Sequence, residues 1–569
     1  MIDKQYKLWC EKAIGDADLI KELNDIKGKE DLISDAFYKN LEFGTAGLRG
    51  VIGAGTNRMN IYTVGQASQG LAAYVNSVTS NGKIAIAYDS RIKSEEFART
   101  AASVFAANGI KVYIYKELMP TPMLSFAVRR LCCDAGVVVT ASHNPAKYNG
   151  YKAYGPDGSQ LGIEEADFVL SIMQKVDMFE DVKSVDYETA LKEGKIEYIG
   201  QDIIDEYLDC VEAQRVEPET DLSELKIVYT PLNGAGNKPV RSILSRLGIT
   251  NVTVVPEQEL PDGNFPTAPY PNPEIRQAFE CALKLAEKEN PDILLATDPD
   301  SDRVGIAVNI NGDYKLFSGN DVGVLLLNYI LERRTANGTL PENPVAVKTI
   351  VSTELCQKIA DRYGCTLINV LTGFKFIGEQ ISILAESKQE NRYIFGFEES
   401  YGYLAGAYAR DKDAVVGSML ICEMTAYYKK QGKTLADVLN SIYDEYGYYC
   451  AEQKSFTCEG QSGMQKIKTI MDTLRENPPK EICGSKVVKI NDYGNSVSLD
   501  ITNNTQTVLT LPKSNVLSFF SEIGSSLIVR PSGTEPKIKI YVNAVGSSYQ
   551  DGMNKKAELI NEGTALLGF

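Results

Sequence analysis

The chain has 569 residues, 44% of them hydrophobic, which at about 150 residues per domain predicts about four domains with buried cores. Its formal net charge of −16 at pH 7 argues against a general nucleic-acid binder, which needs a basic surface to displace phosphate counterions. The charge does not exclude a small anionic substrate, because a local cluster of cations is enough to bind one.

The sequence also argues against secretion and against a membrane span. Residues 1–20 carry charges throughout and lack the apolar stretch of a signal peptide, and the apolar run 322–331 falls short of the roughly 18 residues that a span requires. The 11 cysteines include no C-x-x-C pair, which is typical of reduced and mostly buried thiols. Cys132 and Cys133 are adjacent and form a candidate redox pair, although buried thiols are the simpler interpretation. We therefore expect a cytoplasmic protein.

A strand–helix–strand pattern occurs three times along the chain. In the first copy, a strand at 83–88 precedes a helix at 94–109 and a strand at 111–116. Ser94 is a candidate N-cap of this helix, and Gly109 is suited to its end. The later copies comprise 225–230, 237–248 and 251–256, and then 345–353, a helix ending at Gly364, and 365–371.

Each copy is followed by another apolar strand that runs into a polar loop. These loops are TASHNP (140–145), TDPDSDR (297–303) and EES (398–400). Active-site loops lie at the carboxyl ends of strands in α/β sheets, so three such loops would converge on one cleft. The Pro-rich segment 261–274 is expected to be an ordered surface loop.

After about residue 450 the pattern changes, because short strand-like runs alternate with turns and the chain ends in a helix. This is typical of a separate α+β domain. We therefore predict an α/β fold with three similar α/β domains that have mixed sheets, plus a C-terminal α+β domain, arranged around a central cleft. The predicted domains span residues 1–207, 208–320, 321–448 and 449–569.

The loop TASHNP places Ser142 beside His143, the single histidine of the chain. A polar turn with an N-capping serine is one interpretation of these residues. A serine hydrolase is disfavoured, because the G-x-S-x-G motif is absent and adjacent side chains on a loop rarely face each other.

The loop TDPDSDR places Asp298, Asp300 and Asp302 at alternate positions. In an extended loop this spacing puts three carboxylates on one side, where they suit a hard divalent cation. An EF-hand is excluded, because Arg303 stands where glycine is required and Asn309 where glutamate is required. An arginine beside three aspartates instead indicates a joint site for a metal and a phosphate.

The segment RPSGTEPK (530–537) has the composition of a phosphate-binding loop. Arg530 supplies a fork of donors, Ser532 and Thr534 supply hydroxyls, and Gly533 lets backbone N–H groups approach an anion closely. An ordinary turn is the alternative.

These four loops, in this order and at domain-scale spacing, resemble the α-D-phosphohexomutase superfamily, and within it the phosphoglucomutase/phosphomannomutase type. The resemblance extends over nearly the whole chain and includes FGTAGLRG (43–50). It implies an isomerase, an intramolecular phosphotransferase that moves a phosphoryl group between C1 and C6 of a hexose. The implied route runs through a phosphoserine and a hexose 1,6-bisphosphate.

The resemblance also implies a role for residues of each loop. One of the positive residues around the serine would serve as general acid/base. The implied catalytic residues are Ser142, His143, Lys152 and Arg49. The implied ligands of Mg²⁺ are a phosphoserine oxygen on Ser142 and the carboxylates of Asp298, Asp300 and Asp302. The candidate substrate-binding residues are Glu398, Ser400, Lys375, Arg303, Arg530, Ser532, Gly533 and Thr534.

Glucose 1-phosphate and glucose 6-phosphate are the expected substrates, with glucose 1,6-bisphosphate as activator. Some family members that act on both glucose and mannose phosphates have a histidine shortly after the serine that corresponds to Ser400. In this chain Tyr401 and Gly402 follow Ser400 instead. A phosphomannomutase, a phosphopentomutase and a glucose 1,6-bisphosphate synthase stay open. So do a metal-assisted phosphatase and a non-enzymatic metal- or sugar-phosphate-binding protein. We expect a monomer or homodimer that binds sugar phosphates and neither nucleic acid nor membrane.

The final domain is expected to move during catalysis. A bisphosphate that turns around needs a cleft that loosens, whereas the chemistry needs water excluded. A mobile final domain with a hinge near residues 445–455 would meet both needs.

Overall fold

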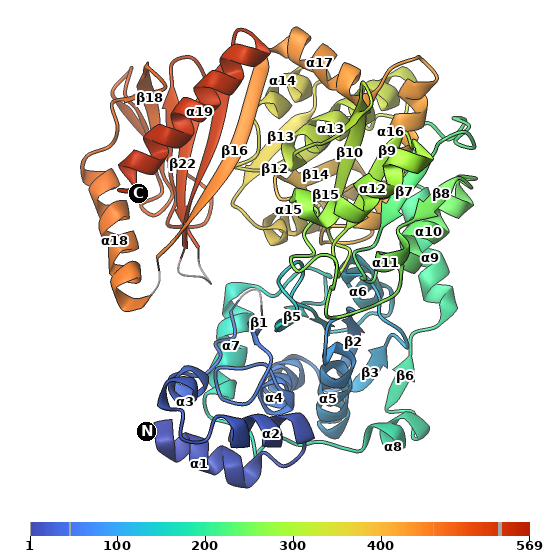
Figure 1. Ribbon diagram of the computed structural model, residues 1–569, viewed down its shortest axis with the longest axis vertical. Coiled ribbons are helices and arrows are strands. Elements are labelled where there is room, and N and C mark those ends of the chain that lie inside the picture. Colours follow the sequence, from blue (N-terminus) through green and yellow to red (C-terminus); the bar gives the residue numbers. More distant parts are fainter. Residues whose placement is uncertain (1, 45–46, 459, 533–536) are drawn as a thin grey trace. The chain divides into compact units, whose positions relative to one another are not determined.

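The computed structural model describes residues 2–44, 47–458, 460–532 and 537–569 of the chain (Figure 1). The chain divides into two compact units. The first unit contains residues 1–317, 378–393 and 401–431, and the second contains residues 318–377, 394–400 and 432–569. Two residues of the predicted phosphate loop, Gly533 and Thr534, lie outside the described residues.

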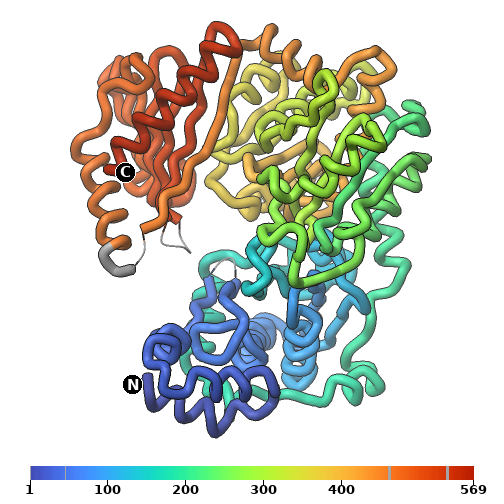
Figure 2. Tube along the Cα trace, in the orientation of Figure 1, coloured from blue at the N-terminus to red at the C-terminus, as the bar shows by residue number. Residues whose placement is uncertain are grey.

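The first unit begins with three short helices, α1 (Ile2–Lys12), α2 (Ala17–Asp25) and α3 (Glu30–Phe37), of which α1 contacts both others (Figure 2). The side chain of Trp9 is fully buried and packs edge-on against the rings of Phe37 and Tyr62, with ring centroids 5.7 Å away in each case. Tyr62 belongs to α4 (Ile61–Val78), so this aromatic cluster attaches the N-terminal helices to the rest of the unit.

The first mixed sheet carries the predicted serine loop. Its strand order is β1-β5-β4-β2-β3-β6, in which β2 runs parallel to β3 and β4, and β5 runs antiparallel to β4 and β1. The strands are β1 (Leu48–Val51), β2 (Lys83–Tyr88), β3 (Lys111–Ile114), β4 (Ala135–Val139), β5 (Tyr148–Tyr154) and β6 (Ile196–Tyr198). The helices between them are α4, α5 (Ser94–Ala107), α6 (Thr121–Arg130), α7 (Ile163–Met173) and α8 (Tyr187–Lys192), and α9 (Gln201–Glu212) follows β6.

The predicted N-cap of α5 is wrong. Ser94 is the first residue of the helix, and the N-cap position is taken by Lys93, which has a φ of 64° and no side-chain capping bond. The Ser94 hydroxyl instead donates to Oδ1 of Asp89 at 2.7 Å. Asp89 follows strand β2 and is buried, and Nδ2 of Asn149 donates to the Ser94 oxygen at 3.0 Å, so both partners of this hydroxyl lie outside the helix.

The second mixed sheet carries the predicted aspartate loop. Its strand order is β11-β10-β9-β7-β8, in which β7 runs parallel to β8 and β9, and β10 runs antiparallel to β9 and β11. The strands are β7 (Ile227–Thr230), β8 (Val252–Val254), β9 (Ile293–Thr297), β10 (Val304–Ile310) and β11 (Asp313–Leu316). The helices are α10 (Asn237–Arg246), α11 (Pro256–Glu259), the short 3-10 helix η1 (Arg276–Phe279) and α12 (Glu280–Glu289).

Two parts of the predicted third domain belong to the first unit. They contain the short 3-10 helix η2 (Glu390–Arg392), strand β15 (Gly402–Leu404) and helix α16 (Ala414–Lys429). Helix α16 contacts α10 and α9, and nearly all of its residues are buried. This burial all around the helix explains why it lacks an amphipathic pattern.

The second unit holds strands β12 (Val345–Thr349), β13 (Thr366–Val370) and β14 (Tyr393–Glu398) in the order β13-β12-β14, with β12 parallel to β13. Helix α13 (Gly319–Ala336) contains the long apolar run and contacts α14 (Leu355–Arg362) and α17 (Leu435–Tyr446). Helix α15 (Phe374–Glu386) begins in this unit. Among the described residues, no helix is long and apolar enough to cross a membrane.

The C-terminal part of the second unit is an antiparallel sheet in the order β16-β23-β22-β21-β18-β19-β20, with β17 paired to β18. Figure 1 shows helix α19 (Tyr549–Leu566) lying across this sheet, where it contacts β23 and β16. Helix α18 is Gly460–Glu476. The strands are β16 (Tyr448–Thr457), β17 (Glu481–Ile482), β18 (Ser485–Asp492), β19 (Val497–Asp500), β20 (Thr505–Val508), β21 (Leu517–Ser521), β22 (Ser526–Pro531) and β23 (Lys537–Gly546).

The C-terminal sheet packs on the β12 and β13 region through a buried apolar cluster. The cluster joins Ile350, Val351 and Leu371 to Val516, Ile528 and two buried tyrosines of the sheet, Tyr493 and Tyr541. The segment predicted to be a hinge, 445–455, contains the end of α17, Gly447 at a φ of 102° and most of β16. Domain motion about this segment stays a prediction.

Candidate active site

Ser142 lies on a tight loop that follows strand β4. Its φ is 53°, in the left-handed region that side chains other than glycine seldom adopt. The loop is held by a bond from the Ser142 amide to Oγ1 of Thr140 at 2.8 Å, and Ser142 is only 4% exposed. The backbone at this residue is therefore strained and closely fixed, as is common where a side chain must be aimed.

The hydroxyl of Ser142 points at the aspartate loop. Its Oγ donates to Oδ2 of Asp298 at 3.0 Å and lies 3.2 Å from Nδ1 of His143. Both loops follow strands of the first unit, β4 and β9, so the structure brings together the serine and aspartate loops that the sequence singled out separately.

Asp298, Asp300 and Asp302 are fully buried and offer ligand atoms that lie within 4.8 Å of one another. Among the described residues, this is the one cluster of acidic, histidine or cysteine side chains that is spaced to hold a metal ion. Oδ1 of Asp300 and Oδ1 of Asp302 are buried and have no hydrogen-bond partner in the part of the chain that the structure describes. Nε of Arg303 lies 3.7 Å from Oδ1 of Asp302. Buried carboxylate oxygens without a hydrogen bond are costly unless a cation meets them, so the three carboxylates fit a hard divalent cation.

Two buried lysines supply positive charge beside these carboxylates. Nζ of Lys152, on strand β5, lies 2.7 Å from Oδ2 of Asp300 and 3.2 Å from Oδ2 of Asp302. Nζ of Lys412 also lies 3.2 Å from Oδ2 of Asp302. Lys412 is not among the residues predicted from the sequence, where the run of charged residues 410–413 just before the apolar helix α16 was the available signal.

The pKa values of Asp298 and Asp302 are pushed apart by their surroundings. Burial raises the pKa of Asp298 well above its usual value, and the like charges of Asp300 and Asp302 raise it further. Burial also acts to raise the pKa of Asp302, but Lys412 and Lys152 outweigh it and hold that pKa below the usual range. The two lysines thus stabilise the negative charge of Asp302 more than that of Asp298.

His143 is neutral at this position. Burial lowers the pKa of its imidazole well below the usual value, and the positive charges of Arg303 and Arg49 lower it further. The ring therefore contributes a hydrogen bond to Ser142 rather than a charge.

The two predicted arginines of this unit differ in their surroundings. Arg49 is exposed on strand β1, opposite Gly150 of β5. Arg303 donates from Nη1 to Oε1 of Glu274 at 2.5 Å, and Glu274 ends the Pro-rich segment 261–274. That segment contains no helix or strand, as predicted.

The predicted sugar-binding residues lie in the second unit, at the end of β14. Glu398 is 5% exposed, and Ser400 is partly exposed. Between them, Glu399 accepts a hydrogen bond from Thr349 Oγ1 at 2.9 Å and one from Ser352 Oγ at 3.4 Å. These bonds fix the middle residue of the loop.

A buried lysine supports this loop. Nζ of Lys348 donates to the carbonyl oxygen of Ser352 at 3.1 Å and to Oε1 of Glu354 at 3.0 Å. Lys375, the remaining predicted residue of this region, lies in α15 with its Nζ 4.9 Å from the ring centroid of Phe376.

The described part of the phosphate loop lies at the end of β22. Arg530 pairs with Lys539 of β23 in the sheet register, and the Ser532 amide donates to the Lys537 carbonyl at 2.8 Å. The side chain of Arg530 hydrogen-bonds Tyr541, whose pKa is raised above the usual range by burial and by the nearby charge of Glu399. A buried tyrosine therefore holds the arginine side chain.

The chain matches three consecutive protein-family models. The model for phosphoglucomutase/phosphomannomutase α/β/α domain I matches residues 40–180, domain II matches 205–311 and domain III matches 318–446. The chain belongs to the phosphoglucomutase/phosphomannomutase family. This membership confirms the predicted family, the α/β domains with a C-terminal α+β domain, and the enzyme class of phosphohexomutases.

Relatives within the family are similar over nearly their full length. The phosphoglucomutase of Staphylococcus aureus (strain bovine RF122 / ET3-1) is 38% identical over 556 residues, which cover 97% of this chain and 98% of that protein. The phosphoglucomutase of Staphylococcus haemolyticus (strain JCSC1435) is 37% identical over 538 residues, which cover 91% of this chain and 95% of that protein.

Solved structures agree in fold. A putative phosphomannomutase from Thermus thermophilus gives a TM-score of 0.69 at 22% identity, over 93% of this chain and 100% of that chain. Parafusin, a phosphoglucomutase from Paramecium, gives a TM-score of 0.70 at 17% identity, over 93% of this chain and 96% of that chain.

Proposed function

We propose that this family member interconverts glucose 1-phosphate and glucose 6-phosphate through a phosphoserine at Ser142. The observation that carries the proposal is the position of Ser142 Oγ, 3.0 Å from a carboxylate of the buried aspartate cluster. Phosphoryl transfer is catalysed mainly by alignment and charge neutralisation, and a fixed serine beside a cation site supplies both.

The reaction conserves the phosphoryl group. The 6-hydroxyl of glucose 1-phosphate attacks the phosphorus on Ser142, the bond from phosphorus to Oγ breaks, and glucose 1,6-bisphosphate forms. The bisphosphate turns around, and Ser142 Oγ then takes the phosphoryl group from C1. Glucose 6-phosphate leaves, and added glucose 1,6-bisphosphate acts as activator because it phosphorylates the free serine.

The residues around Ser142 orient the transfer and move the proton. His143 has a ring nitrogen within hydrogen-bond distance of Oγ, and Arg49 and Lys152 are the positive residues that we assign to the reaction centre with it. Lys152 and Lys412 hold Asp300 and Asp302 in place. The burial of Ser142, Lys152 and Lys412 limits access of the water that would otherwise hydrolyse the phosphoserine.

Mg²⁺ is the proposed metal, bound by Asp298, Asp300, Asp302 and an oxygen of the phosphorylated Ser142. When bound, it supplies positive charge to the phosphoryl oxygens. Three carboxylates with two unbonded buried oxygens match the preference of Mg²⁺ for oxygen ligands.

The remaining assignments are proposals of the same kind. Glu398 and Ser400 bind sugar hydroxyls with help from Lys375, Arg303 binds phosphate once released from Glu274, and the 530–534 loop binds the phosphate that does not react. We propose that the protein acts in the cytoplasm on sugar phosphates alone, as a monomer or homodimer.

The proposal is tested by supplying glucose 1-phosphate, mannose 1-phosphate and ribose 1-phosphate in parallel, with Mg²⁺ and the matching bisphosphate. We expect glucose 1-phosphate to be isomerised fastest, with little inorganic phosphate released. Faster turnover of the mannose or ribose ester would establish the alternative mutases. Phosphate release that exceeds isomerised product would instead identify a phosphatase.

A further inference from the structure

The buried guanidinium of Arg91 contacts three carbonyl groups of the serine loop and a fourth at the start of strand β5. Its Nη1 donates to the carbonyl oxygens of Pro145 at 3.0 Å and Tyr148 at 3.1 Å, and its Nη2 donates to the carbonyl oxygens of Ser142 and Asn144. Arg91 is 3% exposed. One side chain therefore binds backbone carbonyl groups at both ends of the loop, and these bonds fix the loop against Arg91.

The carboxylate of Asp89 connects Arg91 to the amide of Ser142 through Thr140. Oδ2 of Asp89 lies 3.3 Å from Nε of Arg91 and accepts from Oγ1 of Thr140 at 2.6 Å. The same Thr140 hydroxyl accepts the hydrogen bond from the Ser142 amide. The pair of Asp89 and Arg91 thus holds both the N–H and the C=O of Ser142.

The Pro-rich segment 261–274 holds Arg91 from the other side. The ring of Phe265 is fully buried, with its centroid 5.1 Å from the guanidinium carbon. A Cβ added to Gly263 would lie 2.4 Å from the Ile92 amide nitrogen and 2.8 Å from the Arg91 carbonyl carbon, so the two backbones are in direct contact. The same segment ends at Glu274, which binds Arg303 beside the aspartate cluster.

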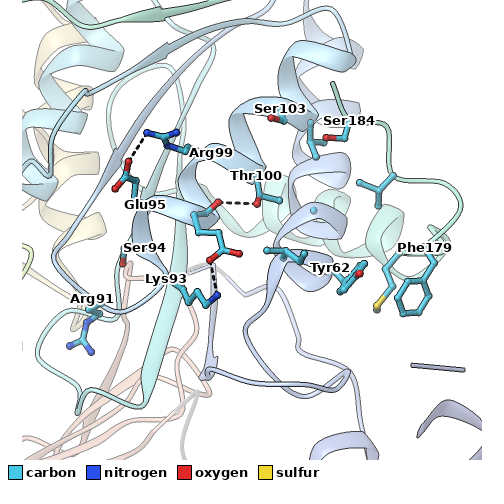
Figure 3. A pocket seen from close by; sticks show the side chains of 16 residues that line it. Tyr62, Arg91, Lys93, Ser94, Glu95, Arg99, Thr100, Ser103, Phe179 and Ser184 are labelled. Atoms are coloured by element: carbon cyan, nitrogen blue, oxygen red, sulfur yellow. Dashed lines mark hydrogen bonds and ion pairs between the residues drawn. The ribbon is translucent and has the colours of Figure 1, made fainter. Parts of the chain in front are cut away.

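Arg91 also borders a cavity of about 980 Å³ lined by residues of α4 and α5. Figure 3 shows its guanidinium directed away from Tyr62 and Phe179 on the far side of that cavity. The cations of the cavity, Lys93 and Arg99, are bound to neighbouring carboxylates such as Glu96 and Glu95. The donors of Arg91 therefore serve the serine loop and not this cavity.

We propose that Arg91 is a positioning residue for phosphoryl transfer, which fixes Ser142 against the aspartate cluster and is itself held by Phe265. The inference rests on the proposed function, because it concerns where the phosphoserine is aimed. A misplacement of about 1 Å lowers transfer rates about 100-fold. Lysine cannot replace the arginine, since one ammonium group cannot span four carbonyl groups.

The test compares Arg91→Lys with Arg99→Lys in steady-state kinetics on glucose 1-phosphate. Arg99 lies on the exposed side of α5 and serves as the matched control. We expect Arg91→Lys to lower kcat about 30- to 100-fold, with KM within about threefold of wild type and with more inorganic phosphate released per turnover. Unchanged kcat, or a KM that rises in step with the fall in kcat, overturns the proposal.

A second pair keeps the test decisive if Arg91→Lys does not fold. Phe265→Leu and Phe279→Leu each remove a fully buried ring, but among the described residues no interaction joins Phe279 to Arg91. We expect a several-fold lower kcat in Phe265→Leu alone, and equal activity of the two variants overturns the proposal. A wild-type protein without mutase activity would instead contradict the proposed function.

Discussion

Oγ of Ser142 lies 3.0 Å from Oδ2 of Asp298, although 156 residues separate the two in the chain. Phosphorylation of this serine would add about two negative charges at pH 7 beside three buried carboxylates. Such a group is stable there only if cations neutralise it, and Lys152, Lys412 and a bound metal ion are the cations that the cluster can supply. The proposed catalysis depends on this juxtaposition.

Ser142→Ala is expected to abolish nearly all mutase activity and to leave the fold intact. The hydroxyl makes hydrogen bonds to Asp298 and His143 but fills little of the core. Coupled-assay kinetics and thermal unfolding measure the two effects, with Ser171→Ala, at a partly exposed serine, as control. Wild-type turnover by Ser142→Ala would rule out the phosphoserine route.

Asp300→Asn is expected to weaken the binding of Mg²⁺ by at least about 10-fold, measured as the rise in the magnesium concentration that gives half-maximal activity. Oδ1 of Asp300 has no hydrogen-bond partner among the described residues, whereas Oδ2 accepts from Lys152 and Thr121, so the variant keeps part of its bonding. Asp205→Asn, at an exposed carboxylate, is the control. An unchanged magnesium dependence would mean that the triplet does not hold the metal.

Arg530→Ala is expected to raise KM for glucose 1-phosphate strongly, to lower kcat and to release more bisphosphate into solution. Arg530 lies at the end of strand β22 beside Tyr541, which packs in the apolar cluster with Ile350, so the variant removes a cation from an ordered strand end. Lys486→Ala, on an exposed position of the same sheet, controls for charge. Normal KM with no leakage of the intermediate would show that this arginine does not grip the phosphate.

Cys133 is expected to resist thiol reagents at neutral pH, whereas the exposed Cys132 reacts. Burial raises the pKa of Cys133 from 9.0 to about 12, so its thiolate is scarce. The native state binds this proton more tightly than the unfolded state does, so stability should fall as the pH rises from 9 toward 12. Rapid labelling of both cysteines would instead support the redox pair that the sequence left open.

The sequence predicted the parts of the site that depend on local spacing. The alternate positions of Asp298, Asp300 and Asp302 predicted that their carboxylates lie together. Ser142 was expected beside them because active-site loops lie at the carboxyl ends of strands. Lys412 and Arg91 were not predicted in this way, because their partners lie far along the chain. Arg91 does follow the predicted strand β2, but the prediction rested only on the loop after the last strand of each unit.

One predicted helix cap was wrong and one strand was not predicted, each for a physical reason. Ser94 has the composition of a cap, but buried Asp89 binds its hydroxyl. Strand β16 was not predicted, since only Cys450 and Phe456 of its ten residues are buried, and its pairing with β23 depends on a contact distant in sequence.

Intact-protein mass spectrometry, followed by peptide mapping, tests the central claim most directly. After incubation with glucose 1,6-bisphosphate and Mg²⁺, we expect the protein to gain one phosphoryl group on Ser142 and to lose it again when glucose 1-phosphate is added in excess. A protein that gains no phosphoryl group, or gains it at another residue while its mutase activity is normal, would contradict the account.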